Sequence, residues 1–199
     1  MSEFPPSLGE DLNTRTIPII RSTEPTPLGT VIVLTGPMGS GKSTVAKKLA
    51  ERLDWNLIDT DELIVTSHGE IPEIFVERGE AYFRNLEAAI INRALDGAAN
   101  AVISLGGGAV LAPDTRKRIA TLDTVFLNVS EDVALERIGG GENRPVLAGN
   151  PRETWRRILN HRLPLYKESA SMEIDTSNKQ VDEVANAIID HYGLSSTRP

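Results

Sequence analysis

The residues best placed to do chemistry form a glycine-rich run that ends in a lysine, a serine and a threonine. Residues 36–44 read GPMGSGKST, which fits the pattern Gly-x-x-x-x-Gly-Lys-Ser/Thr. In this pattern backbone N–H groups cradle phosphate oxygens, the lysine reaches the β- and γ-phosphates, and the serine hydroxyl is a hard ligand suited to Mg²⁺. The run predicts a nucleoside triphosphate site, and the residues assigned to nucleotide binding are Gly39, Ser40, Gly41, Lys42, Ser43 and Thr44.

Two carboxylates follow the next short apolar stretch. Asp59 and Asp61, in LIDTD, lie two positions apart, so both emerge on the same side at the end of a strand. One can hold Mg²⁺, directly or through water, and the other can orient a substrate hydroxyl for attack on the γ-phosphate. The alternative is structural: Asp59 and Asp61 could be an N-cap pair at the start of the next helix, which Asp61 or Thr60 could cap in any case.

Two arginines and a run of glycines indicate what kind of acceptor is phosphorylated. Arg84 (in FRNLE) and Arg162 (in HRLPLY) lie on predicted helices, and two guanidinium groups that converge on one anion suit a carboxylate. The glycines at 106–108 end a predicted strand, where a backbone without side chains can approach a ligand closely. The alternatives are a tight turn at the glycines and a weak surface ion pair of Arg84 with Glu80 or Glu87.

The elements that must position these residues alternate between strands and helices. Short runs rich in β-branched residues predict strands at 30–35, 56–58, 101–105, 124–128 and 172–175. Apolar residues at helical spacing predict helices at 42–53, 61–95 (with breaks near residue 69 and at Gly79), from 113, at 130–138, 152–169 and 181–192. The alternation predicts an α/β protein of the P-loop NTPase fold, with a central five-stranded parallel sheet and helices on both faces.

Composition excludes several classes of function. The 199 residues contain no cysteine, which excludes a disulfide scaffold, thiolate-bound zinc and thiol chemistry. The net charge of -7 argues against nucleic acid or a membrane surface as a partner, and we expect a cytoplasmic monomer. Residues 1–28 hold five of the 12 prolines and predict a flexible tail; 29–193 form one predicted domain, and 194–199 a short C-terminal tail.

Taken in order along the chain, six segments resemble the shikimate kinase family. They are GPMGSGKST, LIDTD, FRNLE, SLGGG, ENRPVL and HRLPLY. The resemblance covers about residues 30–192 and implies direct in-line transfer of a phosphoryl group from ATP to the 3-hydroxyl of shikimate, with Mg²⁺ as the metal. It therefore implies shikimate and ATP as the two partners of the chain.

The resemblance also implies a role for each motif residue. Asp61 would hold the substrate hydroxyls as the candidate base, while Asp59 would lie on the Mg²⁺ side with Ser43. The residues implied for shikimate binding are Asp61, Arg84, Gly106, Gly107, Gly108 and Arg162.

A mobile segment at 139–151 would form a lid in this family. Its arginine, Arg144, would move over the ATP phosphates and act in catalysis together with Lys42 and Asp61. By the same resemblance Arg137 would lie near the adenine, and Lys179 near the nucleotide.

Other functions compete with this interpretation. A GTPase would carry Asn-Lys-x-Asp, but the nearest match, 178–181, has valine at the aspartate position. Another small-molecule kinase, for gluconate or a nucleoside monophosphate, could have the same fold. A nucleotide acceptor, however, would require more phosphate-binding arginines around the acceptor site. A nucleotide-binding regulator would keep the phosphate loop and lose the acceptor residues. ADP release measured with and without shikimate distinguishes these possibilities.

Overall fold

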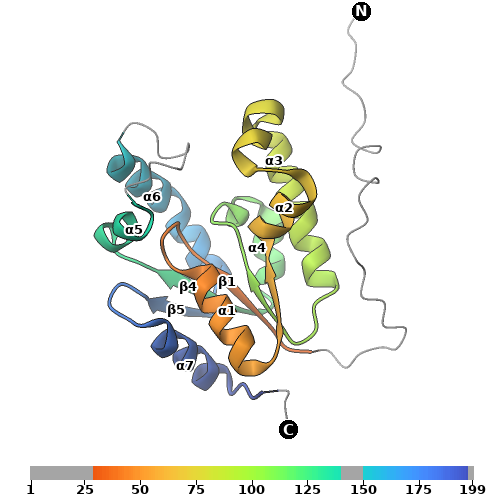
Figure 1. Ribbon diagram of the computed structural model, residues 1–199, viewed down its shortest axis with the longest axis vertical. Helices are drawn as coiled ribbons and strands as arrows, with labels where there is room; N and C mark the ends of the chain where they lie inside the picture. Colours follow the sequence, from red (N-terminus) through yellow and green to blue (C-terminus); the bar gives the residue numbers. More distant parts are fainter. Residues whose placement is uncertain (1–28, 140–149, 197–199) are drawn as a thin grey trace, which may run out of the picture.

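The computed structural model describes residues 29–139 and 150–196 and has the expected α/β architecture (Figure 1). Its strands are β1 (Val31–Thr35), β2 (Asn56–Asp59), β3 (Ala101–Ser104), β4 (Asp123–Asn128) and β5 (Met172–Asp175). Its helices are α1 (Lys42–Leu53), α2 (Thr60–His68), α3 (Ile71–Asp96), the 3₁₀ turn η1 (Ala109–Leu111), α4 (Pro113–Ile119), α5 (Glu131–Arg137), α6 (Pro151–Ser169) and α7 (Val181–Tyr192). The predicted tail 1–28 and most of the predicted lid, including Arg144, lie outside the described residues.

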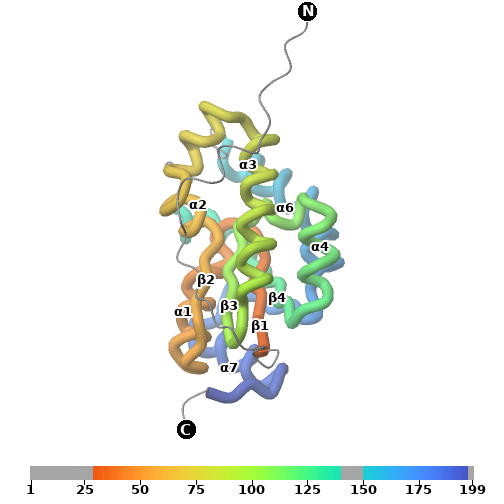
Figure 2. The backbone as a smooth tube through the Cα atoms, turned by 90° about the vertical axis from the view of Figure 1, so that its right-hand side faces the viewer, coloured from red at the N-terminus to blue at the C-terminus, as the bar shows by residue number. Residues whose placement is uncertain are grey.

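The five strands form one parallel sheet in the order β2-β3-β1-β4-β5. Successive side chains of β1 point to opposite faces, so Ile32 and Leu34 pack toward α1 and α7 while Val33 packs toward α3, α4 and α6. Figure 2 shows α1 on one side of the strands and α4 on the other. The central strands are covered on both faces, which explains why they read as continuous apolar runs.

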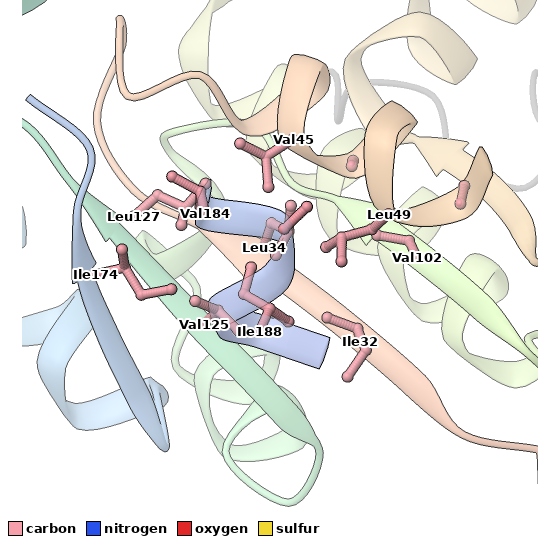
Figure 3. Close-up of a cluster of buried hydrophobic side chains, with 13 residues drawn as sticks. Ile32, Leu34, Val45, Leu49, Val102, Val125, Leu127, Ile174, Val184 and Ile188 are labelled. Atoms are coloured by element: carbon pink, nitrogen blue, oxygen red, sulfur yellow. The ribbon is translucent and has the colours of Figure 1, made fainter. Parts of the chain in front are cut away.

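The layer between the sheet and α1 with α7 is the larger of the two cores that flank the strands (Figure 3). Val45 and Leu49 lie one helical turn apart on α1, and Val184 and Ile188 repeat this spacing on α7. All four side chains are almost fully buried. Each contributes about 1.5–3 kcal/mol by leaving water, so this layer fixes α1 firmly against the sheet. The start of α1, which carries the phosphate-loop lysine, is thereby held in place.

The long predicted helix at 61–95 is interrupted at both expected places. Gly69 ends α2 with φ 96°, and Gly79 has φ 80° and ψ 168° inside α3, where the helical geometry breaks. Both backbone conformations favour glycine, because a Cβ atom would clash at these positive φ values. The outer part of α3 and α2 project beyond the sheet (Figures 1 and 2) and pack on each other through Ile64, Ile74 and Phe83. This projection carries Arg84 at its base.

Throughout the two described ranges, no helix combines the length and the apolar character that crossing a membrane requires.

Candidate active site

The loops that follow the strands meet at the carboxyl edge of the sheet and line a cleft of about 770 Å³. Ligands bind at this edge in open α/β sheets, because the loops after neighbouring parallel strands come together there. Most of the residues singled out from the sequence contribute to its wall. They are Gly39, Ser40, Gly41, Lys42, Ser43, Thr44, Asp61, Gly107, Arg137 and Lys179.

The phosphate loop joins β1 to α1 with three glycines at positive φ. A Cβ atom on Gly39 would lie 2.7 Å from the carbonyl oxygen of Ala134, so a larger residue cannot fit there. The Nζ atom of Lys42 donates hydrogen bonds of 2.9 Å to the carbonyl oxygens of Gly36 and Pro37. The lysine therefore folds back over the loop, with its ammonium group at the place where the pattern expects phosphates.

The phosphate loop is also held from outside by α6. The indole nitrogen of Trp155 donates to the carbonyl oxygen of Met38 at 3.1 Å, and the Trp155 side chain is only 2% exposed. A buried donor without a partner would be costly, so this bond fixes the loop and the helix to each other. Nothing in the local sequence pattern indicated Trp155, because an apolar residue at helical spacing looks like ordinary core.

Asp59 has two roles that the sequence had offered as alternatives. One carboxylate oxygen accepts from the backbone N–H groups of Asp61 (3.1 Å) and Glu62 (3.4 Å), so Asp59 caps α2. The prediction that Thr60 or Asp61 would be the cap is wrong, because α2 begins one residue earlier than expected. The other oxygen accepts from the hydroxyl of Ser43 at 2.6 Å. A carboxylate with two oxygens can thus cap the helix and still contact the serine of the phosphate loop.

Asp61 lies close to Gly106, which follows β3 and has no side chain. A Cβ atom on Gly106 would lie 2.5 Å from Oδ1 of Asp61 and 2.7 Å from Oε1 of Glu87. The intervening Thr60 accepts a hydrogen bond from the N–H of Gly106 (3.1 Å) and donates to the carbonyl oxygen of Ser104 (3.2 Å). Glycine at this position therefore lets two carboxylates come close together beside the cleft.

Arg84 is held by two glutamates on its own helix. Its Nη1 atom donates to Glu87 at 2.7 Å, while Nε and Nη2 reach Glu80 at 3.4 Å. Both ion pairs anticipated from the sequence are present, but the one with Glu87 is not a weak surface pair, because that glutamate side chain is only 4% exposed. The guanidinium also lies against Gly108, where any side chain would collide with it.

Burial raises the pKa of Glu87 above its usual value, against the opposing effect of the Arg84 cation, and the neighbouring Asp61 carboxylate raises it further. The native state therefore binds this proton more tightly than the unfolded chain does. Stability that Glu87 contributes is fully present below the ordinary pKa of 4.5 and is lost as the pH rises through the higher native value.

We expect Glu87→Gln, which is neutral at every pH, to remove this dependence. The free energy of unfolding of the variant minus that of the native chain should rise with pH above about 4.5, by at most about 1.4 kcal/mol per pH unit. Urea unfolding of both proteins between pH 4 and 8 measures the difference. A difference that stays constant across this range would show that Glu87 has no raised pKa.

The second arginine singled out from the sequence comes from α6. Arg162 donates to the carbonyl oxygen of Gly107 at 3.1 Å, and the hydroxyl of Tyr166 donates to the same oxygen at 2.6 Å. Burial raises the pKa of Tyr166 to about 12, so its hydroxyl stays a donor at neutral pH. Arg162 Nη1 lies 3.9 Å from the Cβ position of Gly107, and Arg84 lies against the adjacent Gly108, so the fold brings the two guanidinium groups to the same end of β3.

Arg137 lies on the opposite side of the cleft, at the end of α5. Its Nη1 atom donates to the carbonyl oxygen of Gly39 and to the hydroxyl of Thr176, both at 3.1 Å, and its Nη2 atom donates to the Thr176 carbonyl oxygen at 2.8 Å. Lys179 follows in the loop between β5 and α7 and lines the same cleft. Arg84 and Arg162 lie at the end of β3 and Arg137 contacts Thr176 after β5, so the phosphate loop after β1 lies between them along the sheet edge.

Several residues of the cleft were missed by the sequence analysis. Ser104, Thr176, Ser177 and Asn178 line it, and the last three follow β5 directly. The reasoning applied to LIDTD would have found them, because Asp175-Thr176-Ser177 also ends a parallel strand at the carboxyl edge. Glu87 and Tyr166 lie inside recognised motifs, yet no spacing rule indicates that their side chains are buried.

The parallel sheet, its strand order and the glycine-lysine loop between β1 and α1 define a P-loop nucleoside triphosphate-binding protein. A family model described as shikimate kinase matches residues 38–192. The chain belongs to the shikimate kinase family.

Relatives of known name agree with this assignment. The shikimate kinase of Streptomyces coelicolor is 45% identical over 165 residues, which cover 82% of this chain and 96% of the relative. That of Streptomyces avermitilis is 44% identical over 167 residues, with 82% and 95% covered.

Solved structures agree as well. A shikimate kinase from Acinetobacter baumannii in complex with shikimate is similar with a TM-score of 0.78 at 34% identity, covering 82% of this chain and 93% of that one. For a shikimate kinase from Aquifex aeolicus the TM-score is 0.71 at 32% identity, with 82% and 96% covered.

Proposed function

We propose that this chain transfers the γ-phosphoryl group of ATP to the 3-hydroxyl of shikimate. The observation that carries the proposal is the arrangement of the cleft in a member of this family. The phosphate loop after β1 lines the cleft together with Asp61 and Gly107, while the guanidinium groups of Arg162 and Arg84 lie at Gly107 and Gly108, after the neighbouring strand β3. This arrangement suits transfer from a triphosphate to a hydroxylated carboxylate.

On the donor side, the backbone N–H groups of the phosphate loop and the ammonium of Lys42 would hold the β- and γ-phosphates. To do so Lys42 would exchange the carbonyl oxygens of Gly36 and Pro37 for phosphate oxygens. Arg137 and Lys179 would face the nucleoside, and Arg144 would act on the phosphates from the lid. We further propose that residues 29–193 are the catalytic domain and that 139–151 are its lid.

Mg²⁺ would be held by the hydroxyl of Ser43 and the carboxylate of Asp59. The two oxygens are hard ligands and lie 2.6 Å apart, so they can share one ion. Within the ranges that the structure covers, no group of three or more His, Cys, Asp or Glu side chains could hold a metal alone, so phosphate oxygens and water would complete its shell. The ion, when bound, neutralises charge on the phosphates during transfer.

On the acceptor side, Arg84 and Arg162 would bind the substrate carboxylate, while Gly106, Gly107 and Gly108 let the substrate approach the backbone. Asp61 would accept a hydrogen bond from the 3-hydroxyl and take its proton as the oxygen–phosphorus bond forms. The bond between the γ-phosphorus and the bridging oxygen breaks in the same step, and ADP leaves.

A coupled assay of ADP release tests the proposal. We expect release that depends on shikimate, and a product that carries its phosphate on the 3-hydroxyl, as seen by phosphorus NMR. Gluconate and nucleoside monophosphates serve as alternative acceptors. Shikimate-independent release, or faster release with another acceptor, would refute the proposed function.

Arg84→Lys tests the carboxylate-binding side. Lysine keeps a cation beside Glu87 but loses the planar fork that matches a carboxylate, so shikimate affinity should fall by roughly tenfold or more. ADP affinity should stay unchanged. Calorimetric titration with each ligand measures both, and Arg93→Lys, an exposed arginine on the same helix, is the matched control. Unchanged shikimate binding by Arg84→Lys would remove Arg84 from the acceptor site.

A further inference from the structure

Thr176 follows the last residue of β5 and joins three parts of the nucleotide side of the cleft. It is only 3% exposed. Its hydroxyl oxygen lies 3.1 Å from the carbonyl oxygen of Ser40 in the phosphate loop and 3.0 Å from that of Asn128 at the end of β4. It also accepts from Nη1 of Arg137 at 3.1 Å.

The hydroxyl has one hydrogen and two lone pairs, so it can donate well in only one direction while it accepts from Arg137. The carbonyl oxygen of Asn128 already accepts the backbone N–H of Thr176 at 2.9 Å. Ser40 is fully buried in the middle of the phosphate loop. The hydroxyl hydrogen can thus point to the carbonyl oxygen of Ser40 or of Asn128, and donation toward Ser40 links the loop to Arg137 through a single side chain.

Arg137 is held along its edge by this arrangement. Its Nη1 atom contacts Gly39 and Thr176, and its Nη2 atom contacts the Thr176 carbonyl oxygen at 2.8 Å. Two of these three acceptors belong to Thr176. A planar guanidinium fixed by its edge keeps its broad face for stacking, and this residue lines the cleft.

We propose that Thr176 is a positioning residue for the nucleotide, which sets the phosphate loop at Ser40 and the guanidinium of Arg137 with one hydroxyl group. The inference rests on the proposed function, because it takes the cleft to be the ATP site. In this arrangement the Thr176 hydroxyl positions both the phosphate loop and the arginine on the nucleoside side of the site. The branched side chain helps, because a β-branched residue has few rotamers.

The test is calorimetric binding of ADP and of shikimate to Thr176→Val, which keeps the shape and removes the hydroxyl. ADP affinity should fall by roughly tenfold, as expected when one or two such hydrogen bonds are lost, while shikimate affinity stays the same. Thr176→Ser should retain ADP affinity to within about threefold, because it restores the hydroxyl. If the valine variant does not fold, the comparison of Thr176→Ala with Thr176→Ser takes its place.

Thr124→Val is the matched control. Thr124 is also fully buried and donates to a backbone carbonyl oxygen, that of Ile119 at 2.6 Å, but it lies at the opposite end of the sheet. This variant should lose thermal stability and keep its ADP affinity. A loss of ADP affinity as large as that of Thr176→Val would overturn the inference, since any buried threonine would then do the same.

A double-mutant cycle with Arg137→Ala tests the link itself. Removal of the Thr176 hydroxyl should weaken ADP binding less in the Arg137→Ala background than in the native one. Inorganic tripolyphosphate, which has no nucleoside, should bind more weakly to Thr176→Val, and the loss should be smaller for Arg137→Ala, whose contact with the loop is the bond to Gly39. Full additivity, or native ADP affinity in Thr176→Val, would overturn the inference. Failure of the unaltered chain to bind ADP would instead overturn the proposed function.

Discussion

Lys42→Ala should reduce kcat by roughly 10³-fold while leaving the fold intact. The ammonium group is the strongest positive charge of the phosphate loop, and the charge that develops on the transferred phosphoryl group would lose its stabilisation. Stability should change little, because the hydrogen bonds of Lys42 go to loop carbonyl oxygens at a partly exposed position. Steady-state ADP release and the melting temperature measure the two effects.

Lys47→Ala is the matched control for this variant, since Lys47 lies on the same helix with its side chain exposed. It should keep the native kcat. If Lys42→Ala kept kcat within tenfold of the native value, Lys42 would not contact the transferred group.

The second large effect is expected for Asp61→Asn, which keeps the shape of the side chain and removes its ability to take a proton. A general base contributes about 10²–10⁴-fold, so kcat should fall by that factor, with a much smaller change in the KM for shikimate.

The rate against pH separates the two possible roles of Asp61. If it is the base, the acidic limb of the native kcat profile should disappear in Asp61→Asn. If the variant keeps most of its kcat and loses only affinity for shikimate, Asp61 merely orients the hydroxyl. Asp114→Asn, an exposed carboxylate on α4, is the control for loss of one negative charge.

The strands, the phosphate loop and the break at Gly79 could be predicted because each depends on neighbours in the sequence. An uncharged, β-branched run such as residues 31–35 predicts a strand, and a glycine-lysine pattern predicts a phosphate loop, without information from distant segments. The identity of the α2 cap could not be settled in this way, because Asp59, Thr60 and Asp61 all have side chains able to cap. Only the position where the helix begins decides among them.

The burial of the site residues and their partners from distant parts of the sequence could not be predicted either. Arg84 had two glutamates at suitable spacing, and the burial of Glu87 depends on how α3 meets the glycines after β3. The contacts of Trp155, Tyr166 and Thr176 join segments that are far apart in the sequence. Their geometry follows from the packing of layers, for which one sequence carries no direct signal. The roles of Arg144 and of the lid remain predictions.

One consequence concerns α6. Trp155 connects this helix to the phosphate loop, and Arg162 and Tyr166 connect it to the backbone at Gly107. The helix thus sets the spacing of these two parts of the site, over about 10 Å of helix axis from Trp155 to Arg162, in the turns that precede Pro164. One inserted residue between these contacts would rotate everything beyond it by about 100° and shift it by about 1.5 Å. A change in the number of residues in this stretch of α6 would therefore alter the distance between the two parts of the site, whereas surface loops generally tolerate insertions and deletions.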